Sequence, residues 1–205
     1  MIGVVDYGIG NVAAFLRAFG QMGVPSMRVT SPEDFDQVGK LILPGVGAFD
    51  WAMNKLNSSG LRPKLNEYVQ DRAMPVLGVC VGMQMLFHQS SEGSVPGLGW
   101  LEGSVTRIAT DPEELRLPHM GWNTVRVTGE TTLLEGLDGH EFYFLHSYSV
   151  ETPDTDQIKG LTNYGKEIVS VVEHGSVFGT QFHPEKSHKA GRKILENFIM
   201  DKSNA

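Results

Sequence analysis

The sequence predicts an α/β protein with an open, mainly parallel central sheet flanked by helices and with antiparallel strands in the C-terminal half. Three observations support this fold class. Short apolar runs alternate with helical patterns over about the first ninety residues, strand-like runs dominate the second half, and an amphipathic stretch closes the chain. Alternation of strands and helices favours a parallel sheet covered on both faces. A length of 205 residues suits a single domain over 1–205.

In the first half, strands are expected where an apolar run is bounded by turn residues. These runs lie at 2–5, 25–30, 41–43 and 75–79. Helices are expected where apolar residues recur at helical spacing. They lie at 12–19, at 49–69 with a break at 58–60, and after residue 80 through Met83, Leu86 and Phe87.

In the second half, turn-rich segments with Gly, Pro, Asp and Asn separate further strand-like runs. We expect these strands at 103–108, 123–127, 141–150, 168–174 and 177–182. They should extend the edge of the sheet or form a small side sheet. A closing helix is expected at 187–200, with Ile194, Leu195, Phe198 and Ile199 on its buried face.

Composition excludes several classes of protein. With 40% apolar residues and a mean hydropathy of −0.15, the chain can bury a full core, which excludes disordered, collagen-like and coiled-coil proteins. The net charge of −7 and the lack of any basic run longer than two residues disfavour a nucleic-acid partner. No signal peptide or membrane span is visible, so we expect a cytoplasmic protein without a membrane partner.

The only cysteine, Cys80, excludes an internal disulfide and any multi-cysteine metal site, and we predict no metal or cofactor. It lies between Gly78 and Gly82, where the strand 75–79 meets the following helix. Small flanking residues at such a turn are typical of a nucleophile elbow. Backbone N–H groups at the start of a helix lower a thiol pKa and can hold an oxyanion. The alternative is that Cys80 is a buried small hydrophobe.

A thiolate nucleophile needs a base and a group that orients the base. His183 ends the apolar run 177–182, and Glu185 follows it two residues later. Residues i and i+2 of an extended chain point to the same side, so the Glu185 carboxylate can reach the His183 imidazole. The alternatives are an exposed turn at a strand end, or His146 as the base. A zinc deaminase is excluded, because its His-x-Glu pattern needs two further cysteines.

Two glycine-rich turns are also candidate sites. The segment 44–49 follows a buried strand, where open α/β folds bind ligands, and its N–H groups could face an oxyanion. The segment 8–13 matches the dinucleotide fingerprint, but the expected acidic residue is missing at the end of the second strand. A plain turn is the alternative for 44–49, and the missing acidic residue disfavours NAD binding at 8–13.

Motifs across nearly the whole chain resemble the class I, triad-type glutamine amidotransferases and, within them, the glutaminase subunits of imidazole glycerol phosphate synthase. They are Asp6-Tyr7-Gly8-Ile9-Gly10-Asn11, Pro44-Gly45-Val46-Gly47, Gly78-Val79-Cys80-Val81-Gly82-Met83-Gln84, Pro118-His119-Met120-Gly121-Trp122-Asn123, Phe144-Leu145-His146-Ser147-Tyr148 and Gln181-Phe182-His183-Pro184-Glu185-Lys186-Ser187.

The resemblance implies a role for each group of matching residues. Cys80 would attack the side-chain amide of glutamine, His183 would activate the thiol and protonate ammonia, and Glu185 would orient His183. The remaining roles are an oxyanion hole at Gly45, Val46, Gly47 and Val81; glutamine binding by Gln84, His146, Ser147 and Tyr148; and a partner interface at Asn11, Pro118, Met120, Trp122 and Lys186.

Ammonia is useful only when it is delivered to an acceptor, and the chain has no P-loop and no second domain for acceptor chemistry. A partner polypeptide is therefore expected. The resemblance identifies it as a (β/α)8-barrel cyclase, in a heterodimer that serves histidine biosynthesis. Three alternatives stay open: an amidotransferase subunit for surface sugars, a stand-alone cysteine amidohydrolase, and a binding module in which Cys80 is structural.

Overall fold

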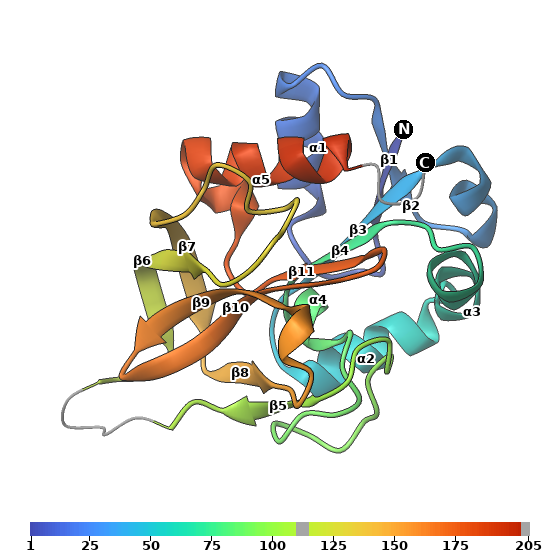
Figure 1. The fold of residues 1–205 in the computed structure, drawn as a ribbon. Helices are drawn as coiled ribbons and strands as arrows, with labels where there is room; N and C mark the ends of the chain where they lie inside the picture. Colours follow the sequence, from blue (N-terminus) through green and yellow to red (C-terminus); the bar gives the residue numbers. More distant parts are fainter. Residues whose placement is uncertain (110–114, 202–205) are drawn as a thin grey trace.

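A nine-stranded sheet forms the centre of the molecule, and its strand order is β2-β1-β3-β4-β11-β10-β9-β6-β7. The computed structural model describes residues 1–109 and 115–201, so residues 110–114 and 202–205 of the expected domain lie outside the described residues. Helices flank the sheet, and a small two-stranded sheet lies beside it (Figure 1). The predicted α/β fold class is confirmed.

Parallel strands make up one half of the central sheet, from β2 to β11. Three of them are buried along their whole length, because helices or neighbouring segments cover both faces. The bounds of the five strands are β1 Ile2–Val5, β2 Ser26–Val29, β3 Lys40–Gly45, β4 Val76–Cys80 and β11 Val177–Thr180.

Antiparallel pairing continues the sheet on the other side of β11. These strands are β10 Lys166–His174, β9 Ile158–Tyr164, β6 His119–Val127 and β7 His140–His146. The side sheet pairs β5 Ser104–Arg107 with β8 Tyr148–Glu151. Both predicted arrangements, an extended edge and a side sheet, are therefore present.

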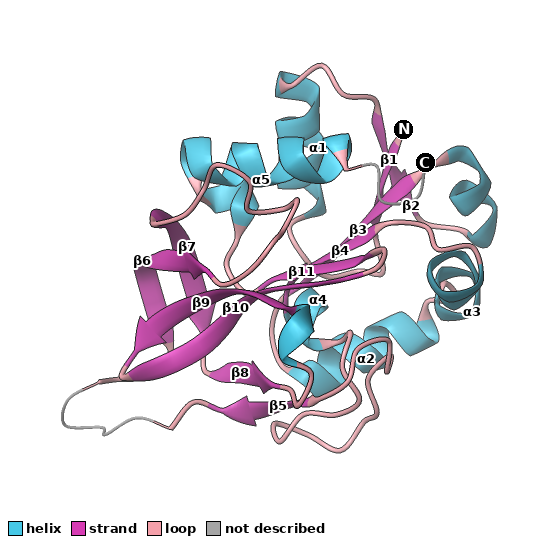
Figure 2. Ribbon diagram, viewed as in Figure 1, coloured by secondary structure: helices cyan, strands magenta, loops and turns pink. Residues whose placement is uncertain are grey.

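Two helices, α1 Val12–Gln21 and α5 His188–Met200, lie together on one side of the sheet (Figure 2). The helices α2 Phe49–Ser58, α3 Arg62–Asn66 and α4 Val81–Gln84 lie on the other side. Short 3-10 helices and one π-helical segment complete the elements: η1 Pro32–Gln37, η2 Glu67–Asp71, which is the π-helical one, η3 Thr155–Gln157 and η4 Pro184–Lys186.

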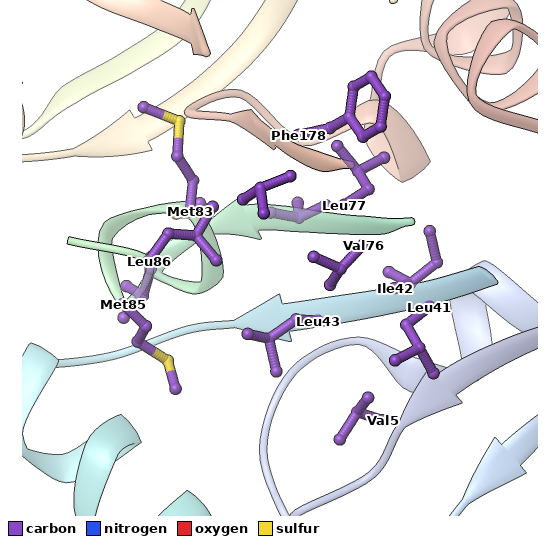
Figure 3. Close-up of a cluster of buried hydrophobic side chains, with 14 of the residues drawn as sticks. Val5, Leu41, Ile42, Leu43, Val76, Leu77, Met83, Met85, Leu86 and Phe178 are labelled. Atoms are coloured by element: carbon purple, nitrogen blue, oxygen red, sulfur yellow. The ribbon is translucent and has the colours of Figure 1, made fainter. Parts of the chain in front are cut away.

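The main core fills the space around β3 and β4. Figure 3 shows Leu43 and Leu77 on these strands, with Met83 and Met85 beside them. On the side of the sheet that α5 covers, the rings of Phe178 and Phe198 pack edge to face, with their centroids 5.5 Å apart. Burial of such side chains stabilises the fold by ~1.5–3 kcal/mol each, and it fixes the position of the strand ends that carry the site.

The helix expected to run from Cys80 through Phe87 is wrong in length, because α4 ends at Gln84. The carbonyls of Met85, Leu86 and Phe87 accept hydrogen bonds from the backbone of 98–101. After Gln84 the chain tightens into i→i+3 turns, because the N–H groups of Leu86 and Phe87 donate to the carbonyls of Met83 and Gln84, while the contacts with 98–101 hold the chain after α4 in another direction. A long helix therefore does not follow Cys80.

Several strand boundaries also differ from expectation. The run 141–150 is broken at Ser147, whose carbonyl accepts from the backbone N–H of Ile108, so β7 and β8 belong to different sheets. The run 177–182 ends at Thr180, and β6 begins at His119 rather than 123. The strand β9 was not predicted, because its lysine, glycine and asparagine interrupt the apolar pattern.

Candidate active site

Cys80 occupies a sharp turn between β4 and α4. Its backbone has φ 57° and ψ −115°, a positive φ that is uncommon for a residue with a side chain. The residue is 3% exposed. A strained residue between a strand and a helix is the arrangement of a nucleophile elbow.

Three glycines make this turn possible. A Cβ on Gly82 would lie 2.0 Å from the carbonyl oxygen of Leu43, and one on Gly45 would lie 2.1 Å from the backbone nitrogen of Gly82. A Cβ on Gly78 would lie 2.7 Å from the Gly82 carbonyl oxygen. The end of β3 therefore packs backbone against backbone on the start of α4, beside Cys80.

His183 and Glu185 form a buried pair. Their Nδ1 and Oε1 atoms are 3.0 Å apart, and their side chains are 4% and 2% exposed. They meet through the helical turn Pro184–Lys186 rather than along an extended strand, so the predicted i, i+2 alternation is not the geometry that joins them.

Strand β7 holds His183 in place. The backbone N–H of His183 donates to the carbonyl of Tyr143 at 2.9 Å. Ser187 closes the arrangement, because its hydroxyl donates to the His183 carbonyl at 2.6 Å and accepts from the Tyr143 N–H at 3.0 Å. The imidazole is thus held by Glu185, and the backbone of the same residue is held by Tyr143 and Ser187.

The electrostatics favour an imidazolium at His183. Burial alone would lower its pKa, but hydrogen bonding and charge interaction with Cys80 and Glu185 outweigh burial and raise the pKa to about 9. Glu185 Oε2 is buried without a hydrogen-bond partner among the described residues. At neutral pH His183 therefore carries a proton that it could donate to a molecule held beside Cys80.

A cavity of about 350 Å³ opens in front of Cys80 and His183. Most of the residues predicted to bind an oxyanion or glutamine line it, namely Val46, Gly47, Val81, Gln84, His146, Ser147 and Tyr148. Gly45 is not among the residues that line the cavity, and it packs on the backbone of Gly82.

Two further residues line the cavity and were missed in the sequence. Glu92 lies in a loop, and its Oε2 accepts from the backbone N–H of Phe49 at 2.8 Å. The carbonyl of Leu145 lies 3.8 Å from Cys80 Sγ. Neither has a local pattern that marks it, although a lone acidic residue among Ser90, Ser91 and Gly93 was a weak signal.

The predicted interface residues divide into two groups. Pro118 and Lys186 line the cavity. Met120 and Trp122 are 65% and 45% exposed on β6, and Asn11 is exposed before α1. Leu145 lies opposite Met120 on β7 and is 39% exposed, so it extends the same apolar surface.

His146 does not fit the reserve role of base. Burial is the main cause that lowers its pKa, to about 3, and both of its ring nitrogens have hydrogen-bond partners. Its ring therefore has no free nitrogen directed at Cys80.

Neither a metal-binding cluster nor a membrane-spanning helix is found in 1–109 and 115–201. These residues contain no group of three or more His, Cys, Asp or Glu side chains placed to hold a metal ion. Each helix in these ranges is too short or too polar to cross a bilayer.

Comparison with known sequences links the whole chain to one family. The family model for glutamine amidotransferase class-I matches residues 3–202. The chain is 45% identical over 201 residues to the imidazole glycerol phosphate synthase subunit HisH of Bdellovibrio bacteriovorus, covering 97% of this chain and 98% of that protein. It is also 45% identical over 200 residues to subunit HisH 2 of Pseudomonas aeruginosa, with the same coverage.

Solved structures show the same fold at lower sequence identity. A crystal structure of a glutamine amidotransferase superposes with a TM-score of 0.75 at 21% identity, covering 97% of this chain and 98% of that one. The structure of PurLQS from Thermotoga maritima matches with a TM-score of 0.74 at 17% identity, covering 97% and 96%.

Proposed function

This chain belongs to the class-I glutamine amidotransferase family and is a glutaminase enzyme, and from that premise we propose that it is the glutaminase subunit of an imidazole glycerol phosphate synthase. It hydrolyses glutamine to glutamate and ammonia and delivers the ammonia to a (β/α)8-barrel cyclase for histidine biosynthesis. The observation that carries this proposal is the meeting of Cys80, His183 and Glu185 beside one cavity.

The chemistry follows from the charges of this trio. The Cys80 thiolate attacks the side-chain carbonyl carbon of glutamine, and the oxygen gains negative charge. His183 donates its proton to the nitrogen, the C–N bond breaks, and ammonia leaves a thioester on Cys80. His183, now neutral, takes a proton from water, which attacks the thioester and releases glutamate.

Backbone N–H groups of 45–47 and Val81 would stabilise the oxyanion in both steps. Val46 and Gly47 line the cavity, and Val81 directly follows Cys80. The short length of α4 means that this stabilisation depends on individual N–H groups near the sulfur.

Substrate selection also fits the cavity. The Glu92 carboxylate provides a negative charge for the α-ammonium group of glutamine, and Gln84, Ser147 and Tyr148 present polar groups around the amino acid. His146 supports this wall through its hydrogen bond to the Tyr148 carbonyl at 2.8 Å. A carboxylate among polar groups favours free glutamine over a glutamine residue inside a peptide chain, whose α-nitrogen is an uncharged amide.

The barrel partner would bind the exposed apolar surface of Met120, Trp122 and Leu145. This surface is next to Pro118 and Lys186, which line the cavity, so ammonia would leave close to the interface. Asn11 would provide a polar contact at the edge. We place the complex in the cytoplasm, where a lone thiol such as Cys80 stays reduced.

Co-purification with the cyclase subunit from the same genome tests the partner. The two chains should elute as a heterodimer, and glutamine hydrolysis should rise strongly when the cyclase binds its nucleotide substrate. Cys80→Ser should abolish glutamine-dependent synthesis and leave ammonium-dependent synthesis intact, because the acceptor site lies on the cyclase.

Other results would point to the alternatives. Binding to a surface-sugar enzyme but not to the cyclase would favour that pathway, and full activity on an amide without any partner would favour a stand-alone hydrolase. Glutamine turnover retained in Cys80→Ser would remove Cys80 as the nucleophile.

A further inference from the structure

A chain of hydrogen bonds runs behind the cavity wall and begins on β6. The Asn123 side-chain nitrogen lies 3.1 Å from His119 Nε2. His119 Nδ1 lies 3.0 Å from His146 Nε2, and His146 Nδ1 lies 2.8 Å from the carbonyl oxygen of Tyr148. Both histidines are buried, at 3% and 7% exposed.

The Tyr148 carbonyl, the last acceptor in this series, determines which ring nitrogen of His146 and of His119 carries the proton. A carbonyl oxygen only accepts, so His146 must carry its proton on Nδ1 and present Nε2 as an acceptor. His119 must then donate from Nδ1, which leaves its Nε2 to accept from the Asn123 amide. The same amide also donates to the carbonyl of Asn163 at 3.0 Å, which confirms its orientation.

Both rings are held in the neutral form that this series requires. Burial lowers the pKa of His119 to about 4, and it is the main cause that lowers the pKa of His146 to about 3. His119 also stacks on two rings, Phe144 at 4.7 Å and Tyr164 at 4.1 Å between centroids. The ring therefore has a packing contact and a hydrogen-bonding contact that can be separated by substitution.

The series continues from Tyr148 to the sulfur. The Tyr148 carbonyl also accepts from Gln84 Nε2 at 3.1 Å. The same nitrogen donates to Gln181 Oε1 at 3.0 Å, and Gln181 Nε2 lies 3.8 Å from Cys80 Sγ. Gln84 and Gln181 are 2% and 0% exposed. The carbonyl of Tyr148 is thus held from two sides, by His146 and by Gln84.

We propose that His119 is a positioning residue for the glutamine pocket. It acts through His146, whose single permitted tautomer holds the wall at Ser147 and Tyr148 in the shape that glutamine needs. At the break between β7 and β8, the Ser147 carbonyl accepts from the Ile108 N–H and Tyr148 pairs with Arg107 of β5, and the side-chain hydrogen bonds to the Tyr148 carbonyl add to this support. The inference rests on the proposed glutaminase function.

Nitrogen NMR tests the protonation states directly. Long-range ¹H–¹⁵N spectra of the ¹⁵N-labelled protein at pH 7 should show both His119 and His146 as neutral Nδ1–H tautomers, assigned with the variants His119→Phe and His146→Phe. An Nε2–H tautomer at His146 would overturn the inference, whatever the enzyme does.

Two substitutions separate hydrogen bonding from packing. His119→Phe keeps the stack on Phe144 and Tyr164 but removes the donor. His119→Asn removes the stack but can place an amide N–H near the position of Nδ1. His140→Phe, at an exposed histidine on β7, serves as the matched control.

Cys80 is the reporter of the pocket. Its rate of alkylation by 6-diazo-5-oxo-L-norleucine, which requires a seated glutamine analogue, is compared with its rate by iodoacetamide, which does not. We expect His119→Phe to lower the ratio of the two rates about five- to tenfold, the effect of losing one buried hydrogen bond. His119→Asn should restore it to within about twofold of the unmodified protein, and His140→Phe should leave it unchanged.

The steady state of the complex with the cyclase provides a second readout. His119→Phe should raise KM for glutamine by the same factor and change kcat much less, because Cys80 and His183 are untouched. An unchanged ratio and KM in His119→Phe, with damage only in His119→Asn, would show that the ring merely packs. If the unmodified protein does not react with the glutamine analogue, both the inference and the proposed function fail, whereas equal behaviour of all variants overturns only the inference.

Discussion

The two halves of the central sheet differ in what their faces touch. In the parallel half, β1, β4 and β11 are buried along their whole length. In the antiparallel half, β6 alternates, with Met120 and Trp122 outward and His119 and Val125 inward. A strand covered on both faces can hold a strained residue such as Cys80, and a strand with one open face can bind another protein.

The proposed catalytic trio, Cys80, His183 and Glu185, joins these halves. Cys80 comes from the end of β4 in the parallel half. The backbone of His183, which follows β11, hydrogen-bonds to Tyr143 of β7 in the antiparallel half. Movement of the open half against the buried half would therefore change the distance between the proposed nucleophile, Cys80, and the proposed base, His183.

The largest effect should come from crowding the parallel half. Gly82→Ala places a methyl group 2.0 Å from the Leu43 carbonyl oxygen, and such overpacking costs ~1–3 kcal/mol or more. We expect a clear loss of unfolding free energy in urea and loss of glutaminase activity. Gly20→Ala, in α1 with open space around it, should instead stabilise by up to ~1 kcal/mol. Equal stability of the two variants would contradict the close approach of β3 and α4.

Removal of the proposed base, His183, should have the next largest effect. His183→Ala should lower glutamine-dependent turnover by ~10²–10⁴-fold, the usual contribution of a general acid–base group. Ammonium-dependent turnover should be unchanged. His174→Ala, at an exposed histidine of β10, is the control, and a similar loss there would indicate general damage.

The open half should respond through binding rather than folding. Trp122→Ala and Met120→Ala should each weaken cyclase affinity, by ~30-fold where the side chain is a hot spot, with no change in the melting temperature beyond a few degrees. Met200→Ala is matched to Met120→Ala, since the two methionines are 69% and 65% exposed. Titration calorimetry checks this, and an affinity loss in Met200→Ala would mean that the apolar surface is misplaced.

The smallest effect should be the dependence of kcat on pH, which follows from the pKa of His183 in its pair with Glu185. Hydrogen bonds and charge from Cys80 and Glu185 overcome burial and raise the pKa of His183 to about 9. The proton needed by departing ammonia is present below this value, so kcat should fall to about half at pH 9 and continue downward. The stability that the imidazolium contributes is complete below its unfolded pKa of ~6.5 and is lost as pH rises through 9.

Glu185→Gln sharpens this prediction. It keeps a side chain of the same shape but removes the negative charge that supports the imidazolium. The alkaline fall in kcat should therefore move to lower pH. A fall that stays at the same pH would assign it to another group.

Local signals made the fold and the trio predictable. Apolar runs bounded by turn residues predicted four of the parallel strands, and three of these are buried, and therefore apolar, almost throughout. The strand β11 was expected among the antiparallel strands, but it pairs parallel with β4. Cys80 was visible through its glycine flanks, and His183 through its position after an apolar run. Their roles remain predictions that the variants above would test.

Long-range contacts account for what the sequence did not predict. The path of the chain after α4 depends on hydrogen bonds between 85–87 and 98–101, and the place of Glu92 depends on the Phe49 N–H. The pairing of His119 with His146 needs the register of β6 and β7, which sets these residues opposite each other. No pattern along the chain marks such pairings, because they form only when strands are placed side by side.

Strand β3 separates the site from both ends of the described chain. Its last residue, Gly45, lies opposite Cys80, while the carbonyl of Met1 accepts from Gly39 just before its start. Lys40, its first residue, donates to the carbonyl of Asp201 at 2.7 Å. Six residues of strand cover ~17–20 Å. A fluorescent protein fused ahead of Met1 would therefore lie at the opposite rim from the cavity, and energy transfer to a labelled cyclase could follow assembly in living cells without obstructing it.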